Sequence, residues 1–242
     1  MLLYIIRHGE PDYSTDSLTA NGKKQALALA NRFGSHGFDE IYSSPLGRAK
    51  QTAEPTCERL KLPFIIEEWM SEDLVYNDFS ITNENGSSDW AIVGNDVEIM
   101  KGALTQDNWF NHPVFGKCRS ARGGYQRIIA ASDEFLARLG WQREGEVYYN
   151  ATWEKDTLQK ASATKKVAAF CHHGLGTTWL SHLLSIPFHL MWCGFDIAHS
   201  GVTVLEFAAN NDGYAVPRCL CWSDISHIYK EETPLHSPLK NF

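Results

Sequence analysis

Two short segments of the sequence each place histidine and glycine directly after an apolar run. In the segment "LLYIIRHG" the polar residues are Arg7 and His8, and in the segment "VAAFCHHG" they are His172 and His173. A short continuous apolar run is typical of a parallel strand that is covered on both faces. Open parallel sheets bind ligands beyond the carboxyl ends of their strands. These polar side chains are therefore the first candidates for a functional site.

A further cationic residue, Arg48, lies in "SSPLGRAKQTA". We expect a helix with Pro45 at its first position, so that Arg48 lies in a first turn, where an anion is favoured. Arg7, His8, Arg48 and His173 would then converge on one small volume. Such a cluster suits a dianionic phosphoryl group, which arginine can bind bidentately. A neutral imidazole can also attack phosphorus and form a covalent phosphohistidine.

The elements that would position these residues follow the pattern of a parallel sheet. Residues 2–6 and 167–171 predict strands, and the segment "LTANGKKQALALANRFG" predicts a helix capped by Thr19. The final segments "GVTVLEFAA" and "YAVPRCLCWSD" predict two strands that could pair as a hairpin. We therefore expect an α/β fold, a three-layer α/β/α sandwich with a mostly parallel mixed sheet.

The middle of the sequence predicts an insertion. A length of 242 residues suits one large α/β domain, so we expect a single domain over residues 1–242. Residues 73–122 are rich in Asn, Gly, Asp and Trp, and their helical periodicity is weak. We expect this segment to form a cap that determines substrate specificity.

Composition narrows the classes of partner. Lys and Arg number 22 against 29 Asp and Glu, and the net charge of −7 disfavours nucleic acid or an anionic membrane as partner. We find no leader and no apolar stretch of about eighteen residues, so we expect a cytoplasmic protein. Six cysteines without CxxC spacing give little support to a zinc site or disulfide framework. We expect no metal and no cofactor, and the sequence does not indicate the oligomeric state.

Four motifs together resemble the histidine phosphatase superfamily, also called the phosphoglycerate mutase-like family. They are "RHGE", "LTANGKKQA", "SSPLGRAKQTA" and a late "HG" after a strand. The resemblance implies that His8 becomes phosphorylated and that Arg7, Arg48 and His173 hold the phosphoryl oxygens. In "CHHG" the family's "HG" pair selects His173 and leaves His172 where a small hydroxyl residue is common. The implied substrate is a small phosphorylated molecule.

The family also uses a carboxyl group as proton donor to the leaving oxygen. The segment "LPFIIEEWMSED" places Glu72 where the family has the glutamate of an "LxE" segment. A carboxyl group there could protonate the leaving group and then activate water. Glu67, Glu68 and Asp73 lie close by, and Asp73 is the main rival for this role. The alternative to a functional Glu72 is a solvated acidic patch, because the segment holds four carboxylates and such runs are usually exposed.

Four further residues are weaker candidates for substrate contacts. Ser14 takes the place of an asparagine in the family's "RHGxTxxN", and His199 lies in a loop that approaches the site in relatives. Arg119 and Arg122 could reach a distal anionic group of the substrate from the cap, or they could be solvated loop arginines.

The leading hypothesis is a phosphomonoesterase that forms a phosphohistidine. A phosphoglycerate mutase is the closest rival, although no "ERxYGxxxG"-like segment follows the "LxE" position. A non-catalytic binder of phosphorylated ligands is a second alternative. A metal hydrolase using His8, His172, His173 and a carboxylate ranks last, because two arginines in the same pocket would repel the cation.

Overall fold

The structure is a computed structural model that describes residues 1–92, 94, 96–102, 104–153 and 164–230. Its centre is a six-stranded sheet with the strand order β13-β11-β1-β10-β4-β5. Four strands are parallel, β1 (Leu2–Arg7), β10 (Lys166–Cys171), β4 (Glu40–Ser43) and β5 (Phe64–Ile66). The last two, β11 (Val202–Glu206) and β13 (Arg218–Asp224), run antiparallel to their neighbours. The predicted mostly parallel mixed sheet is confirmed.

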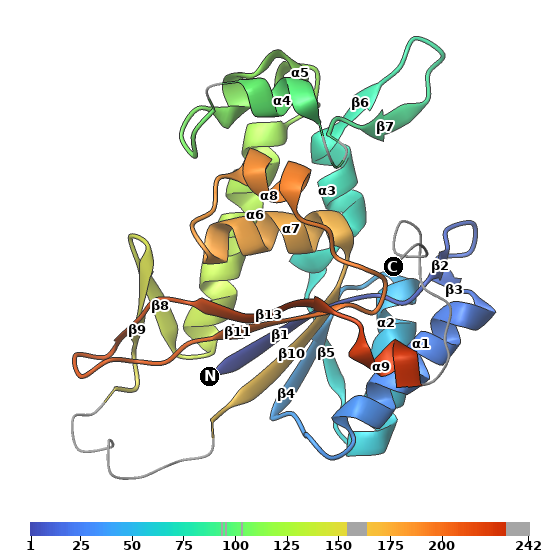
Figure 1. Ribbon diagram of the computed structural model, residues 1–242, viewed down its shortest axis with the longest axis vertical. Helices are drawn as coiled ribbons and strands as arrows, with labels where there is room; N and C mark the ends of the chain where they lie inside the picture. The colour runs from blue at the N-terminus through green and yellow to red at the C-terminus, as the bar shows by residue number, and fades with distance from the viewer. Residues whose placement is uncertain (93, 95, 103, 154–163, 231–242) are drawn as a thin grey trace.

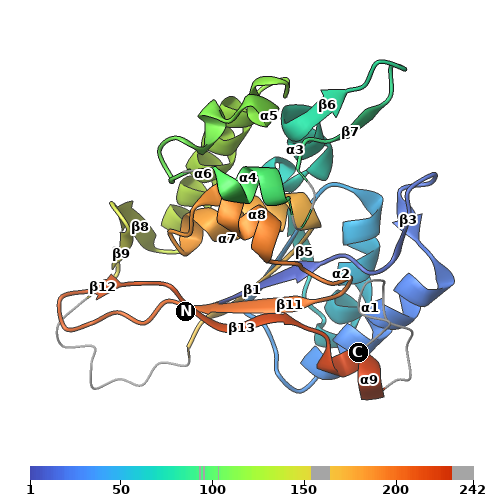
Figure 2. The ribbon, with the colours of Figure 1, turned by 45° about the horizontal axis from the view of Figure 1, so that its top comes forward.

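Helices cover both faces of this sheet (Figure 1). One face carries α1 (Ala20–Phe33), α2 (Gly47–Leu60) and α9 (Ser226–Lys230). The other carries α3 (Glu72–Phe79), α6 (Ala121–Arg138), α7 (His173–Leu183) and α8 (Phe188–Gly194). Figure 2 shows the same three layers from a second direction. The predicted three-layer α/β/α arrangement is confirmed.

Strand β1 is buried on both sides, as its continuous apolar run predicts. Leu3 and Ile5 belong to the core cluster that includes Phe135 of α6. Tyr4 and Ile6 point to the opposite face and belong to the cluster under α1. Because both faces of β1 are packed, the residues that follow the strand have a rigid support.

The two N-terminal helices begin in different ways. Thr19 caps α1, and its hydroxyl accepts the N–H of Gly22 at 3.0 Å, as predicted. The prediction that Pro45 begins α2 is wrong, because the helix begins at Gly47. The N–H of Gly47 donates instead to the distant carboxylate of Asp16 at 2.5 Å. The N-terminus of α2 is therefore capped by a residue that is distant in the sequence, and no local sequence signal marks this cap.

Residues 73–122 contribute most of α3 and then several short elements above α7 and α8 (Figure 1). These are β6 (Ser80–Thr82), β7 (Ser88–Trp90), α4 (Val97–Lys101), η2 (Trp109–Asn111) and α5 (Pro113–Gly116). Trp109 is 1% exposed and packs on Phe188 of α8 with ring centroids 4.3 Å apart. Within the predicted cap, positions 93, 95 and 103 lie outside the described residues.

Small sheets and turns complete the fold. They are β2 (Pro11–Asp12) with β3 (Ser17–Leu18), the sheet of β8 (Trp141–Glu144), β9 (Val147–Asn150) and β12 (Tyr214–Ala215), and the turn η1 (Glu68–Met70). The six cysteines are all free thiols. None of the helices in the described part of the chain is both long and apolar enough to cross a membrane. Among the described residues, no three His, Cys, Asp or Glu side chains are grouped to hold a metal ion.

Candidate active site

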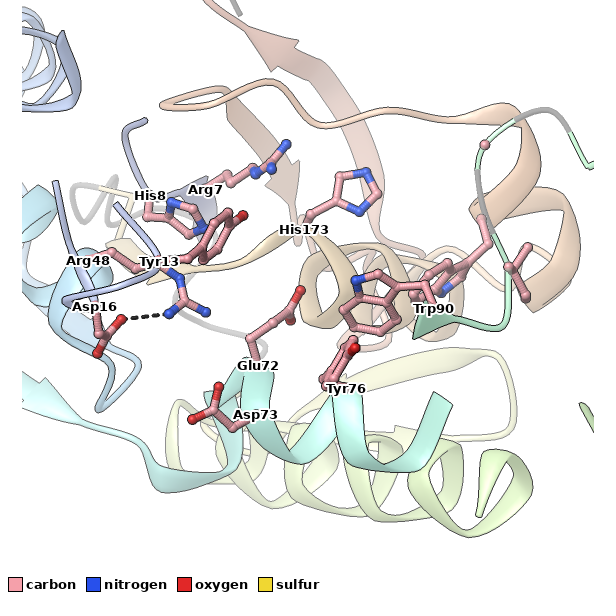
Figure 3. Close-up of a pocket in the computed structure, with 13 residues that line it drawn as sticks. Arg7, His8, Tyr13, Asp16, Arg48, Glu72, Asp73, Tyr76, Trp90 and His173 are labelled. Atoms are coloured by element: carbon pink, nitrogen blue, oxygen red, sulfur yellow. Dashed lines mark hydrogen bonds and ion pairs between the residues drawn. The ribbon is translucent and has the colours of Figure 1, made fainter. Parts of the chain in front are cut away.

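A cavity of about 570 Å³ lies beside the carboxyl ends of β1 and β10 (Figure 3). Five of the predicted site residues line it, although they come from widely separated segments of the chain. The residues that line it are Arg7, His8, Tyr13, Asp16, Arg48, Glu72, Asp73, Tyr76, Trp90, Ile92, Gly94, His173 and Trp192. The sequence motifs therefore converge in space at the edge of the sheet where a ligand is expected.

His8 follows β1 and is 2% exposed. Its Nδ1 lies 2.7 Å from the carbonyl oxygen of Gly9. A carbonyl can only accept, so Nδ1 carries the proton and Nε2 keeps its lone pair. Burial, together with nearby His172 and Arg7, holds the pKa of His8 well below its usual 6.5. His8 is therefore a neutral imidazole with an available Nε2, the form in which histidine acts as a nucleophile.

Two buried arginines lie beside His8. The guanidinium of Arg7 donates to the carbonyl of Ile197 and lies 2.9 Å from Nε2 of His199. Arg48 donates to Oδ1 of Asp16 at 2.6 Å. In each arginine the Nε–H is buried and has no hydrogen-bond partner. An unpaired buried donor costs about 1–3 kcal/mol, and the oxygens of an anion would satisfy both.

The structure places His172 nearer to His8 than the resemblance implies. The two rings have centroids 5.1 Å apart, and His172 is fully buried as the residue that precedes α7. Ser44 accepts the N–H of Leu46 at 3.3 Å and lies 2.7 Å from Nε2 of His172, so its hydroxyl can donate to that nitrogen. In that arrangement Nδ1 of His172, which has no partner, carries the proton. His172 then presents a buried N–H donor beside the imidazole of His8.

His173 occupies a different position. It is the first residue of α7, and it lines the cavity with its side chain 29% exposed. Its Nε2 lies 2.9 Å from Oδ1 of Asp196, and its ring is 6.3 Å from that of Trp192. Besides burial, the neighbouring groups that lower the pKa of His8 are His172, Arg7 and Arg48. His173 is therefore at the rim, while His172 belongs to the cluster around the imidazole of His8.

Glu72 begins α3 and contacts the N-terminus of α7. Its Oε1 accepts the N–H of Gly174 at 2.7 Å and its Oε2 accepts that of Leu175 at 2.8 Å. Burial raises the pKa of Glu72 above 4.5, although these two N–H groups and nearby His173 oppose the shift. The rival Asp73 also lines the cavity but is exposed. Glu72 thus combines a position in the cavity with the raised pKa that suits a proton donor.

Tyr13 and Asp16 are among the lining residues that were not predicted as site residues. Tyr13 is 68% exposed, and its ring centroid lies 5.4 Å from the guanidinium carbon of Arg48. Asp16 holds Arg48 through the ion pair drawn in Figure 3 and has a left-handed backbone, with φ of 47°. The spacing between Asp16 and Arg48 carries no sequence signal, because their contact depends on how the β2–β3 turn folds over α2.

Three of the four weaker candidates lie away from the cavity, and the fourth, His199, lies next to Arg7. Ser14 is exposed, and its hydroxyl donates to Oδ1 of Asp12 at 2.6 Å. Arg119 is exposed, and Arg122 packs over the ring of Phe110 at 4.4 Å. None of these three side chains lines the cavity. His199 does not line the cavity, but it contacts Arg7 and its ring lies 5.5 Å from that of His8, so it helps to hold the arginine in place.

The buried histidines predict a steep loss of stability in acid. The folded-state pKa values of His8 and His172 are depressed below 6.5, so their contribution is present above pH 6.5 and is lost as the pH falls. Each histidine should remove roughly 1.4 kcal/mol of unfolding free energy per pH unit below that point. Urea unfolding of wild type and His8→Ala between pH 7.5 and 5 should give slopes that differ by this amount. Equal slopes would mean that folded His8 is protonated, contrary to its assignment as a neutral nucleophile.

Comparisons with known proteins agree with this geometry. Residues 3–76 match the model of the Histidine phosphatase superfamily (branch 1). A probable phosphoglycerate mutase, GpmB of Salmonella arizonae, is 39% identical over 61 residues, which are 22% of this chain and 28% of that protein. The match therefore spans little more than a quarter of the relative's length. The resemblance that the motifs predict is confirmed.

Solved structures with the same fold cover nearly the whole chain. A mycobacterial glucosyl-3-phosphoglycerate phosphatase has a TM-score of 0.61 and 20% identity, over 92% of this chain and 98% of the other. YhfR of Bacillus stearothermophilus has a TM-score of 0.59 and 19% identity, over 94% of this chain and 98% of the other. A phosphoserine phosphatase of Entamoeba histolytica has a TM-score of 0.56 and 19% identity, also over 94% of this chain and 98% of the other. At these identities the likeness establishes the fold.

Proposed function

We propose that this chain, whose residues 3–76 match the model of the Histidine phosphatase superfamily (branch 1), hydrolyses a phosphomonoester through a phosphohistidine on His8. The observation that carries the proposal is the hydrogen bond from Nδ1 of His8 to the Gly9 carbonyl beside two buried, unpaired arginine N–H groups. That bond leaves Nε2 free to attack phosphorus, and the arginines match the charge of a phosphoryl group.

In the first step Nε2 of His8 attacks phosphorus and the bond from phosphorus to the leaving oxygen breaks. Arg7, Arg48 and the N–H of His172 stabilise the charge on the phosphoryl oxygens during this transfer. The carboxyl group of Glu72 gives its proton to the leaving oxygen and becomes a carboxylate. In the second step Glu72 takes a proton from water, the water oxygen attacks phosphorus, and the P–N bond breaks to release phosphate and neutral His8.

We assign the phosphoryl contact to His172, where the resemblance implied His173. The ring of His172 lies 5.1 Å from that of His8, and its buried Nδ1 has no other partner. His173, paired with Asp196 at the rim, is then placed beside the leaving group.

A phosphatase and a mutase differ in the acceptor of the phosphoryl group. We expect purified protein to release inorganic phosphate from phenyl phosphate at least tenfold faster than it interconverts 2- and 3-phosphoglycerate with bisphosphoglycerate present. Beyond Arg7 and Arg48, no Lys or Arg is among the described residues that line the cavity, so a bound sugar acid phosphate has no cation for its carboxylate. A mutase rate higher than the rate of hydrolysis would identify a mutase instead of a phosphatase. Binding of phosphate without any turnover would indicate a binding protein.

The proton donor can be tested through the leaving group. Glu72→Gln should lower kcat/KM about 100-fold for an alkyl phosphate and less than tenfold for 4-nitrophenyl phosphate, because kcat/KM reports the step in which the leaving group departs and nitrophenolate leaves without a proton. Glu68→Gln, which removes an exposed carboxylate from the same segment, is the matched control. If Asp73→Asn showed this dependence on the leaving group and Glu72→Gln did not, Asp73 would be the donor.

A further inference from the structure

The cavity has two chemically different ends (Figure 3). Arg7, His8 and Arg48 form the polar end, and Tyr76 and Trp90 lie at the other, with Glu72 between them. The volume of about 570 Å³ is within the range of sites that bury a drug-sized ligand. The phosphoryl group accounts for the polar end alone, so the aromatic end is available to the rest of the substrate.

Glu72 sets the direction in which the substrate extends. As the proposed proton donor it must lie next to the leaving oxygen, with phosphorus on the side of His8. A Cβ on Gly174 would lie 2.9 Å from Oε1 of Glu72 and 2.9 Å from Cη2 of Trp90. The indole edge is therefore beside the carboxyl group. A leaving group that continues away from phosphorus past Glu72 reaches the indole.

The aromatic end is held in place by contacts within the protein. Trp90 packs edge to face on Tyr76 with ring centroids 5.0 Å apart, and its centroid lies 5.3 Å from that of Trp192. Trp192 is 4% exposed, and its Nε1 donates to Oγ1 of Thr178 at 3.2 Å. The hydroxyl of Tyr76 donates to the carbonyl of Ser88. These rings are fixed before a ligand binds. A flat apolar group can therefore pack against them without the entropic cost of ordering these side chains.

The charge around the aromatic end disfavours a second anion. The described residues that line this end include no Lys or Arg, the imidazole of His173 is already paired with Asp196, and Asp73 and Glu72 on α3 contribute carboxyl groups. A carboxylate or second phosphate on the leaving group would be desolvated next to these groups without a partner.

We propose that the substrate is a phosphomonoester whose leaving alcohol or phenol carries an aromatic ring and no second negative charge. This inference rests on the proposed function, because it uses the same cavity and the same proton donor. A substrate of this class would distinguish this chain from enzymes whose substrates are phosphorylated carboxylic acids.

The test compares esters whose leaving alcohols are equally reactive. We expect kcat/KM for 2-phenylethyl phosphate to exceed that for n-propyl phosphate about 30-fold, because the ring is buried at the aromatic end. We expect 3-phosphoglycerate to be a poorer substrate than n-propyl phosphate. Since both test esters have primary alkyl leaving groups, a difference between them reports contacts with the ring rather than leaving-group chemistry.

Three variants locate the selectivity. Trp90→Ala should lower the ratio of the two kcat/KM values about tenfold, and Trp90→Phe should restore most of that ratio. Trp153→Ala is the matched control, because its indole packs near Gly213 of the β8-β9-β12 region, and it should leave the ratio unchanged. Using a ratio within each protein removes the effect of any misfolded fraction.

Failure of this inference can be distinguished from failure of the proposed function. If wild type hydrolyses both esters with equal kcat/KM, or prefers 3-phosphoglycerate, the inference is overturned and the phosphatase assignment stands. If no ester is hydrolysed, the proposed function and the inference both fail. A ratio that falls equally in Trp90→Ala and Trp153→Ala would also overturn the assignment of the aromatic end.

Discussion

His8→Ala is expected to lower kcat/KM for phenyl phosphate about 10⁴-fold, as the loss of a nucleophile does in enzymes with a covalent intermediate. The imidazole follows a strand that is packed on both faces, so its removal should leave the fold intact. Arg7 and Arg48 remain, and inorganic phosphate should still inhibit residual activity or bind measurably. Steady-state rates of phosphate release and a phosphate-binding titration give the two readouts.

The control for His8→Ala is His112→Ala, which removes an imidazole at the start of α5. This variant should keep wild-type kinetics within a factor of two. A His8→Ala protein that retains more than one tenth of wild-type activity, with a normal unfolding transition, would contradict the role of His8.

His172→Ala is expected to lower kcat/KM about 300-fold, the usual cost of removing one donor that stabilises a transition state. His173→Ala should lower it less than tenfold, because that imidazole is at the rim and is paired with Asp196. Both variants remove a histidine at the start of α7, so each serves as the matched control for the other. Rates with phenyl phosphate, measured together with the thermal unfolding midpoint, separate a catalytic effect from loss of stability.

The opposite order of effects would contradict the assignment of His172. A large loss in His173→Ala with a small loss in His172→Ala would restore the role that the resemblance gives to His173. His172→Asn adds a further check, since an amide can still donate a hydrogen bond and should recover part of the activity lost in His172→Ala.

The parts of the site that could be predicted are those in which local sequence determines position. The apolar run of β1 is buried on both faces, and this fixes Arg7 and His8 at the end of the strand. Arg48 remains in the first turn of α2 even though the helix begins two residues later than predicted. In each case a shift of one or two residues at the element boundary leaves the side chain near the cavity.

The choice between His172 and His173 could not be predicted because it depends on a single residue. Strand β10 ends at Cys171, His172 has an extended backbone with φ of −132°, and His173 begins the helix. Two adjacent histidines after an apolar run do not indicate where the strand gives way to the helix. One position faces His8 and is buried, and the next points along the rim.

Contacts between distant segments were also beyond prediction. Asp16 caps α2 and pairs with Arg48, and neither contact has a local signal. Trp90 and Trp109 belong to the same predicted cap, yet Trp109 is buried against Phe188 while Trp90 lines the cavity. The composition of the segment does not distinguish the two tryptophans, and their different positions follow from tertiary packing.

A covalent phosphohistidine on His8 can be detected by trapping it during turnover. Wild type should be mixed with excess phenyl phosphate, quenched in alkali within the first turnovers, digested and analysed by mass spectrometry, since the P–N bond is labile in acid. A phosphoryl group is expected on the peptide that contains His8, and it should be absent in His8→Ala. It should accumulate in Glu72→Gln with 4-nitrophenyl phosphate, because this leaving group departs without a proton while water attack is slowed. Release of phosphate during the first turnover with no such adduct, or an adduct on another residue, would contradict this mechanism.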